Sequence, residues 1–361
     1  MHNIFDYIEQ YQNCTFDIEK FNDVDNLILS RLAFIDFDNC NGETLQEIAE
    51  KIDNEIVRKQ KSKVQKSTYL LLKAVAKTAR FSEIKVSDFV NETDDIQYAF
   101  SAVTFNLNDE KNFIAFRGTD DSMASIYEDF AMSSEFPILS QAKALDYVKS
   151  QVLNNDKTFY LGGHSKGGNL ALFSYVFANE NIRNKIIRVY NNDGPGFPNK
   201  SVVLYSKDIS FNKVKFIAPK DSIVGRLMFF DAQYTIVESR SHLMKQHNVF
   251  NWKLDGKKLK SADEFSFTSD MLDNFLTTSL NSINSKELDK VNLYMNSLIN
   301  KFNLSYKQDI DFIVFSKILI FTLKNEEHLI SRKMIENLLK AVGKGLVSTF
   351  HTTHTTFWLN A

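Results

Sequence analysis

The chain has 361 residues, of which 43% are hydrophobic and 24% are charged, and its formal net charge is −2. This composition is ordinary for a globular protein, and the length allows one large core or a core with an accessory domain. Nothing in this charge balance suggests nucleic acid or an anionic membrane surface as the main partner.

Segments that would anchor or export the chain are not expected. No window approaches the 18 consecutive apolar residues that suggest a transmembrane helix. The N-terminal sequence MHNIFDYIEQYQNC is acidic where a signal peptide is basic, and no apolar region follows it. Cys14 and Cys40 are too few for a disulfide framework, so we expect a cytoplasmic protein.

The first part of the chain is predicted to be helical and to pack beside a central sheet. Three segments have apolar residues at helical spacing, namely residues 23–35, 43–52 and 66–80. From about residue 95 the pattern changes to that of strands. Residues 96–107 and 112–117 are rich in aromatic and branched residues and flank a turn at Asp109, so they predict a hairpin.

After this hairpin, helix and strand patterns alternate. Helices are predicted over 122–132, 139–153 and 166–179, and strands over 157–162, 186–191, 213–217 and 233–238. Such alternation predicts an α/β fold: a mainly parallel, α/β-hydrolase-like sheet with helices on both faces.

The C-terminal third is predicted to be helical. Candidate helices cover residues 268–282, 285–302, 308–324 and 326–342. The chain then divides into an α/β domain over 1–255, with its core at about 95–255, a helical region over 256–350 and a frayed tail over 351–361.

The pentapeptide Gly163-His164-Ser165-Lys166-Gly167 carries the main chemical signal. It has the form G-x-S-x-G and stands between a predicted strand and a predicted helix, the setting of a nucleophile elbow in α/β-hydrolases. Glycine is needed beside the serine because the strained turn leaves no room for side chains. The Lys166 N–H, at the start of the helix, is expected to face the developing oxyanion, and His164 is expected to pack.

A second signal, Phe116-Arg117-Gly118-Thr119, ends an earlier strand. A second oxyanion donor is expected in such a loop, and we assign it to the Thr119 N–H. Together with GHSKGGN, this motif resembles the class 3 lipases and a related bacterial lipase-like family, over residues 95–255. Lys166 departs from that pattern, which usually has Leu there. The resemblance also implies that Asp129 holds the hydroxyl of Thr119, although an exposed helix position explains that aspartate nearly as well.

A serine nucleophile needs a base and an orienting acid, which follow it in this fold in the order acid, then histidine. Asp221 matches the class 3 pattern of strand, short loop and Asp, and is favoured over Asp193, which lies in a Gly-Pro loop. His247 opens HNVFNW, which resembles the family pattern, and is favoured over His242.

We therefore expect a serine hydrolase acting on carboxylic esters of lipid or short acyl groups, with no cofactor and no metal. His351 and His354 have the spacing of metal ligands, but no neighbouring carboxylate or cysteine completes a site. The run Met228, Phe229 and Phe230 could line an acyl pocket or form a lid. A thioesterase, amidase or acyltransferase with the same triad, or a catalytically silent scaffold that binds a partner, are the alternatives.

Overall fold

The computed structural model describes residues 2–60, 62–93, 98–120, 122–133, 135–198, 210–228, 230, 232–281 and 301. Its centre is a seven-stranded sheet with the strands in chain order. These strands are β1 (Lys85–Thr93), β2 (Ala99–Asn106), β3 (Lys111–Phe116), β4 (Thr158–His164), β5 (Ile186–Asn192), β6 (Val214–Pro219) and β7 (Tyr234–Val237).

The sheet is antiparallel at one edge and parallel elsewhere. Strands β1, β2 and β3 pair antiparallel, and the β2–β3 hairpin confirms the predicted one. From β3 to β7 every pair is parallel, so these strands end at the same edge of the sheet. This edge is where an open α/β sheet binds its ligands.

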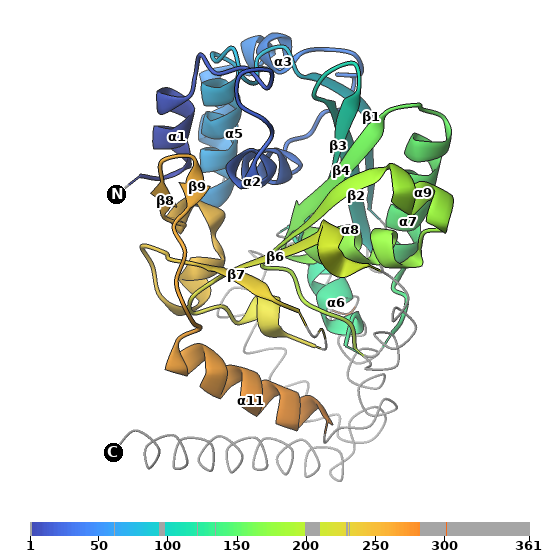
Figure 1. The fold of residues 1–361 in the computed structure, drawn as a ribbon, viewed down its shortest axis with the longest axis vertical. Coiled ribbons are helices and arrows are strands. Elements are labelled where there is room, and N and C mark those ends of the chain that lie inside the picture. Colours follow the sequence, from blue (N-terminus) through green and yellow to red (C-terminus); the bar gives the residue numbers. More distant parts are fainter. Residues whose placement is uncertain are drawn as a thin grey trace.

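Side chains alternate between two cores along the strands, because successive residues of a strand point to opposite faces. On β3, Phe113 and Ala115 face a core built with the N-terminal helices, while Ile114 and Phe116 face the other core. The second core contains α7 (Leu139–Leu153) and α8 (Lys166–Phe177). Figure 1 shows the two helical layers on opposite sides of the sheet, as the alternating pattern predicted.

The N-terminal helices start at well-formed caps. The side chain of Asn22 caps α2 (Asp23–Leu32), and Asp25 completes the capping box from the first turn. Asn26 of the same helix exchanges hydrogen bonds with Asn192 at the end of β5. This buried amide pair fixes the helical layer against the strand end that carries the functional site. The other helices of this layer are α1 (Ile4–Gln10), α3 (Leu45–Lys51), α4 (Asn54–Lys59) and α5 (Lys63–Val75).

Several shorter elements complete the described part of the fold. They are α6 (Met123–Ala131), α9 (Glu180–Lys185), η1 (Phe211–Lys213), η2 (Val224–Arg226), η3 (Leu243–His247), η4 (Val249–Asn251), β8 (Leu254–Asp255) and β9 (Lys258–Leu259). The predicted helix at 268–282 is confirmed as α11 (Phe267–Asn281). The helices predicted over 285–302, 308–324 and 326–342, and the tail, lie outside the described residues apart from Lys301. Among the helices that are described, none is long and apolar enough to cross a membrane.

Candidate active site

Ser165 lies in a sharp turn between β4 and α8. Its backbone angles are φ 59° and ψ −131°, a region that side-chain-bearing residues rarely adopt. The Ser165 N–H donates to the Asn192 carbonyl at 3.0 Å, and its own carbonyl accepts from Gly168. The strain is therefore held by hydrogen bonds on both sides, and the elbow geometry predicted from the sequence is present.

Three glycines allow the loop after β3 to lie directly against this elbow. A Cβ on Gly118 would come within 2.2 Å of the His164 carbonyl oxygen. A Cβ on Gly163 would meet the Gly167 backbone at 2.3 Å, and one on Gly167 would meet the Phe116 carbonyl oxygen at 2.2 Å. Since a Cβ at these distances would force backbone atoms to move, glycine is favoured on steric grounds at all three positions.

Two backbone amides, of Thr119 and Lys166, are expected to form an oxyanion hole. Among the described residues, neither the Thr119 nor the Lys166 backbone N–H has a hydrogen-bond partner. The Thr119 hydroxyl is bound by the Asp129 carboxylate, at 2.8 and 2.7 Å from its two oxygens. Asp129 is exposed to a cavity, and desolvation by the protein around it raises its pKa in spite of the nearby Lys166 charge.

His247 is paired with Asp193. The His247 Nδ1 lies 2.7 Å from Asp193 Oδ2, and the Asp193 side chain is almost fully buried. Asp193 follows β5 directly, with φ 51°, and its other oxygen accepts from the Ser222 hydroxyl and the Gly225 N–H. The carboxylate against the ring therefore belongs to the residue that the sequence ranked second.

Asp221, which the sequence favoured as this partner, lies at the next strand end and has other contacts. Its Oδ2 accepts from the Gln246 side chain at 2.6 Å, and its N–H donates to the same amide. Its carboxylate is 3.4 Å from Nδ1 of His242, whose side chain is 90% exposed. Asp221 thus holds the loop that carries His247, through the residue immediately before the histidine.

His164 also contacts the loop that carries His247. Its Nε2 lies 2.7 Å from the His247 carbonyl oxygen, and the two imidazole rings are 4.4 Å apart. Burial, with the neighbouring charges of His247 and Arg31, lowers the pKa of His164 well below its ordinary value, so the ring is neutral and Nε2–H is the donor. The sequence assigned His164 only a packing role and missed this contact.

A cavity of about 920 Å³ opens at this edge of the sheet. Ser165, His247, Thr119 and Lys166 all contribute to its wall. Among the described residues, however, no hydrogen bond joins the Ser165 hydroxyl to an imidazole nitrogen. Other parts of the wall are apolar, and these residues are Phe34, Val64, Ile126, Met132, Pro195, Val224, Leu227, Met228 and Val249.

The predicted lid or acyl-pocket run is only partly in this wall. Met228 lines the cavity, but Phe230 packs against Phe216 and Phe211 in a separate aromatic cluster. Phe229 lies outside the described residues, as do His351 and His354. Within the described part of the chain, no group of three His, Cys, Asp or Glu side chains could hold a metal ion.

Comparisons with known proteins add the following. A family model described as Mbeg1-like matches residues 75–297. Among solved structures, the crystal structure of M37 lipase is similar at 16% sequence identity and a TM-score of 0.34, covering 55% of this chain and 67% of that chain. No curated protein matches the chain significantly.

Proposed function

The chain belongs to the Mbeg1-like family, and from this premise we propose that it is a serine hydrolase that cleaves carboxylic esters. The family relationship is lipase-like. One observation carries the proposal: a strained serine turn shares a cavity with a histidine that is hydrogen-bonded to a buried aspartate. These are the three groups that serine acyl transfer needs.

In the proposed mechanism, the His247 Nε2 takes the proton of the Ser165 hydroxyl as its oxygen attacks the substrate carbonyl. The oxyanion accepts hydrogen bonds from the Thr119 and Lys166 N–H groups, which have no other partner among the described residues. His247 then returns the proton to the leaving alcohol, and water hydrolyses the acyl-enzyme by the same steps. The Ser165–His247 hydrogen bond forms when substrate binds, as is common where an unliganded site is loose.

We assign the acid to Asp193 instead of Asp221. Asp193 touches the ring at Nδ1, and its second oxygen is fixed by two donors, so it can hold the imidazole in one orientation and stabilise its charged form. Asp221 supports the loop of His247 indirectly, by binding the side chain of Gln246.

The substrate proposed is an ester with an apolar acyl group. A cavity of about 920 Å³ is at the upper end of the usual range for ligand pockets, and the apolar part of its wall suits an acyl chain. The same triad could serve a thioester or an amide. A panel of one acyl chain carrying oxygen, sulfur and nitrogen leaving groups separates these reactions by their kcat/KM values.

The central test is turnover of p-nitrophenyl esters together with labelling by a fluorophosphonate. The wild-type protein should do both, and Ser165→Ala should lose labelling and reduce kcat by roughly 10⁴–10⁶. His247→Asn should lose activity, while His242→Asn, an exposed histidine on the same loop, serves as its control and should retain it. A wild-type protein that neither turns over nor labels, or an active Ser165→Ala, contradicts the proposal.

A further inference from the structure

A buried ion pair lies directly beneath the nucleophile, where class 3 lipases usually have an apolar residue. The Lys166 ammonium is 2.7 Å from Glu128 Oε2, and the two side chains are 1% and 2% exposed. Removing two charges from water is costly, and an apolar pair of similar volume is often as stable or more stable. The pair therefore calls for an explanation other than stability.

All three donors of the ammonium are used, and both carboxylate oxygens accept hydrogen bonds. The Lys166 ammonium donates to the Ala99 carbonyl at 3.1 Å and to the Ser125 hydroxyl at 3.2 Å, besides Glu128. Glu128 also accepts from the Ser140 hydroxyl at 2.7 Å and the Ser140 N–H at 3.0 Å. Such full satisfaction fixes the geometry of a buried polar network instead of leaving it adaptable.

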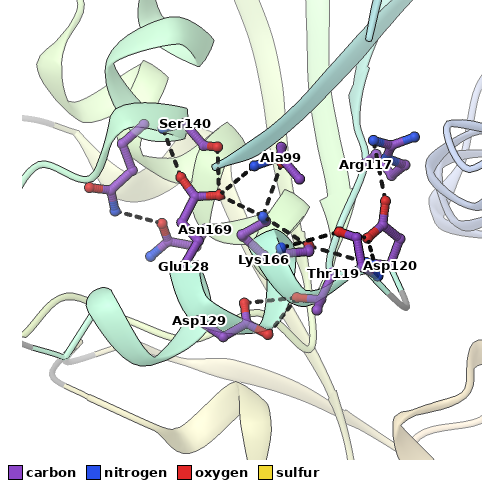
Figure 2. Close-up of polar contacts among 12 residues, drawn as sticks. Ala99, Arg117, Thr119, Asp120, Glu128, Asp129, Ser140, Lys166 and Asn169 are labelled. Carbon is purple, nitrogen blue, oxygen red and sulfur yellow. Dashed lines mark hydrogen bonds and ion pairs between the residues drawn. The ribbon is translucent and has the colours of Figure 1, made fainter. Parts of the chain in front are cut away.

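The network reaches both halves of the proposed oxyanion hole. Ser125 and Glu128 are one turn apart on α6, so both can contact the same ammonium. The Ser125 hydroxyl also accepts from the N–H of Asp120, the residue after Thr119. On the next position of the same helix, Asp129 binds the Thr119 hydroxyl. Figure 2 shows the contacts of Lys166 with Glu128 and Ala99, and those of Thr119 with Asp129.

Helix α6 thus holds two backbone amides that come from different strand ends. One amide belongs to Thr119, after β3, and the other to Lys166, after β4. An oxyanion needs both donors at about 2.7–3.1 Å, so the spacing between the two segments must be fixed closely. The glycine contacts set how near the segments can approach, and the Lys166 contacts prevent them from separating.

We infer that Lys166 and Glu128 are positioning residues that fix the oxyanion hole through α6. This inference rests on the proposed function. It assigns to the Lys166 side chain a role separate from that of its backbone N–H, and it gives Glu128 a role that neither the sequence nor the comparisons indicate. The role is geometric, because the ammonium has three acceptors and does not touch the reacting atoms.

The test compares wild-type protein with the double variant Lys166→Leu/Glu128→Leu, which removes both charges together. Its Tm should fall, because Ala99, Ser125 and Ser140 lose hydrogen-bond partners, but by less than in Lys166→Leu or Glu128→Leu alone, which would leave one charge buried without its partner. Its kcat and its rate of fluorophosphonate labelling should fall about 10- to 100-fold, with KM nearly unchanged, because misplaced donors affect the transition state and not ground-state binding.

Ser125→Ala gives an independent measurement if the double variant does not fold. It removes only the hydroxyl shared by Lys166 and Asp120, and kcat should fall about 3- to 10-fold at an unchanged KM. Tyr7→Phe is the matched control, because it removes a 2.8 Å hydrogen bond to Asp25 in the other buried ion pair of the described residues, Asp25–Arg80. That variant should lower Tm and leave kcat unchanged.

The outcomes separate the two proposals. If the wild-type protein labels with fluorophosphonate and turns over esters, but the folded variants keep kcat within about twofold, the pair is structural only and this inference is overturned. If the wild-type protein does neither, the proposed function itself fails, and the positioning role fails with it.

Discussion

Asp193 and Asp221 follow neighbouring strands and both support the loop of His247, but they do so at different distances from the ring. Asp193 bonds the imidazole itself, whereas Asp221 bonds the side chain of Gln246. An acid that touches the ring controls its orientation and its charge, whereas one that holds the loop affects only the ring's position.

Asp193→Asn should therefore reduce kcat by about 10⁴, the size of effect expected when the orienting carboxylate becomes an amide. Asp221→Asn retains an oxygen that can accept from Gln246, and its kcat should stay within about tenfold of the wild type. Steady-state kinetics on both variants, with Tm as a check on folding, makes the comparison. Equal losses in the two variants would contradict the assignment of the acid to Asp193.

His164 gives the fold a pH dependence. Its buried, neutral ring has a pKa well below the ordinary value, chiefly because of desolvation. In the unfolded chain the residue takes up a proton as the pH falls below about 6.5, and in the folded chain it does not. The free energy of unfolding should therefore decrease below that pH by up to about 1.4 kcal/mol per pH unit.

His164→Gln tests this dependence, because its amide can still donate to the His247 carbonyl but does not titrate. Denaturant titrations between about pH 7.5 and about pH 5 should show a flatter curve for the variant. Parallel curves for the two proteins would mean that His164 is not the responsible group.

Among the elements, the contact between the β3 loop and the β4–α8 elbow depends most on side-chain size. Gly118→Ala would place a Cβ 2.2 Å from the His164 carbonyl oxygen and 3.2 Å from the Ser165 Cβ. The elbow must shift, so we expect a loss of about 1–3 kcal/mol in stability and a lower kcat. Gly42→Ala is the control: its φ of 84° costs stability, but no atom lies near and kcat should be unchanged. Retention of full kcat in Gly118→Ala would contradict the tight contact.

Periodicity was enough to predict the hairpin, the parallel strands and most of the helices. It failed at β1, because this edge strand is mostly exposed and KVSDFVNET has few apolar residues to alternate. It also missed α1 and α4, helices of 7 and 6 residues that are too short to show a helical period. Helix α4 and most of β1 are exposed, whereas α1 buries Ile4, Tyr7 and Ile8, so a short element can be missed even where it packs in the core.

The sequence predicted those parts of the candidate site whose residues lie close together in the chain. The elbow lies within five consecutive residues, and its glycines are visible in the sequence. The Asp193–His247 pair joins residues 54 apart, and the sequence offered two strand-end aspartates as candidates for the acid. The conformation of the histidine loop distinguishes the two aspartates, because Gln246 binds Asp221 and His247 binds Asp193. The Glu128–Lys166 pair, 38 residues apart, had no signal beyond an unusual lysine.

At the scale of the whole molecule, the N-terminal helices complete the core and are not an appendage. A large part of one core cluster comes from α1, α2, α3 and α5, and the same cluster contains Val103, Phe105 and Phe113 of the sheet. Lys215 of β6 and Asp23 of α2 form an ion pair across the same contact.

A chain that begins at Ser62 lacks α1 to α4 and would expose this apolar face of the sheet. We expect it to aggregate or to lose cooperative unfolding, because an uncovered sheet face of this size is not stable in water. Size-exclusion chromatography and a denaturant titration measure both effects against the full chain. A monomeric, cooperatively folding truncation would show that the sheet does not depend on these helices.

The backbone angles at Ser165 link the thermal stability of this protein to its proposed catalysis. Serine is held there in a conformation that glycine adopts freely, so Ser165→Gly should relieve the turn and produce a chain that withstands heat better than its parent. If the Ser165 hydroxyl is the proposed nucleophile, the less stable of the two proteins is the active one. The difference in melting temperature between the wild-type protein and Ser165→Gly then measures the stability lost to the strained turn.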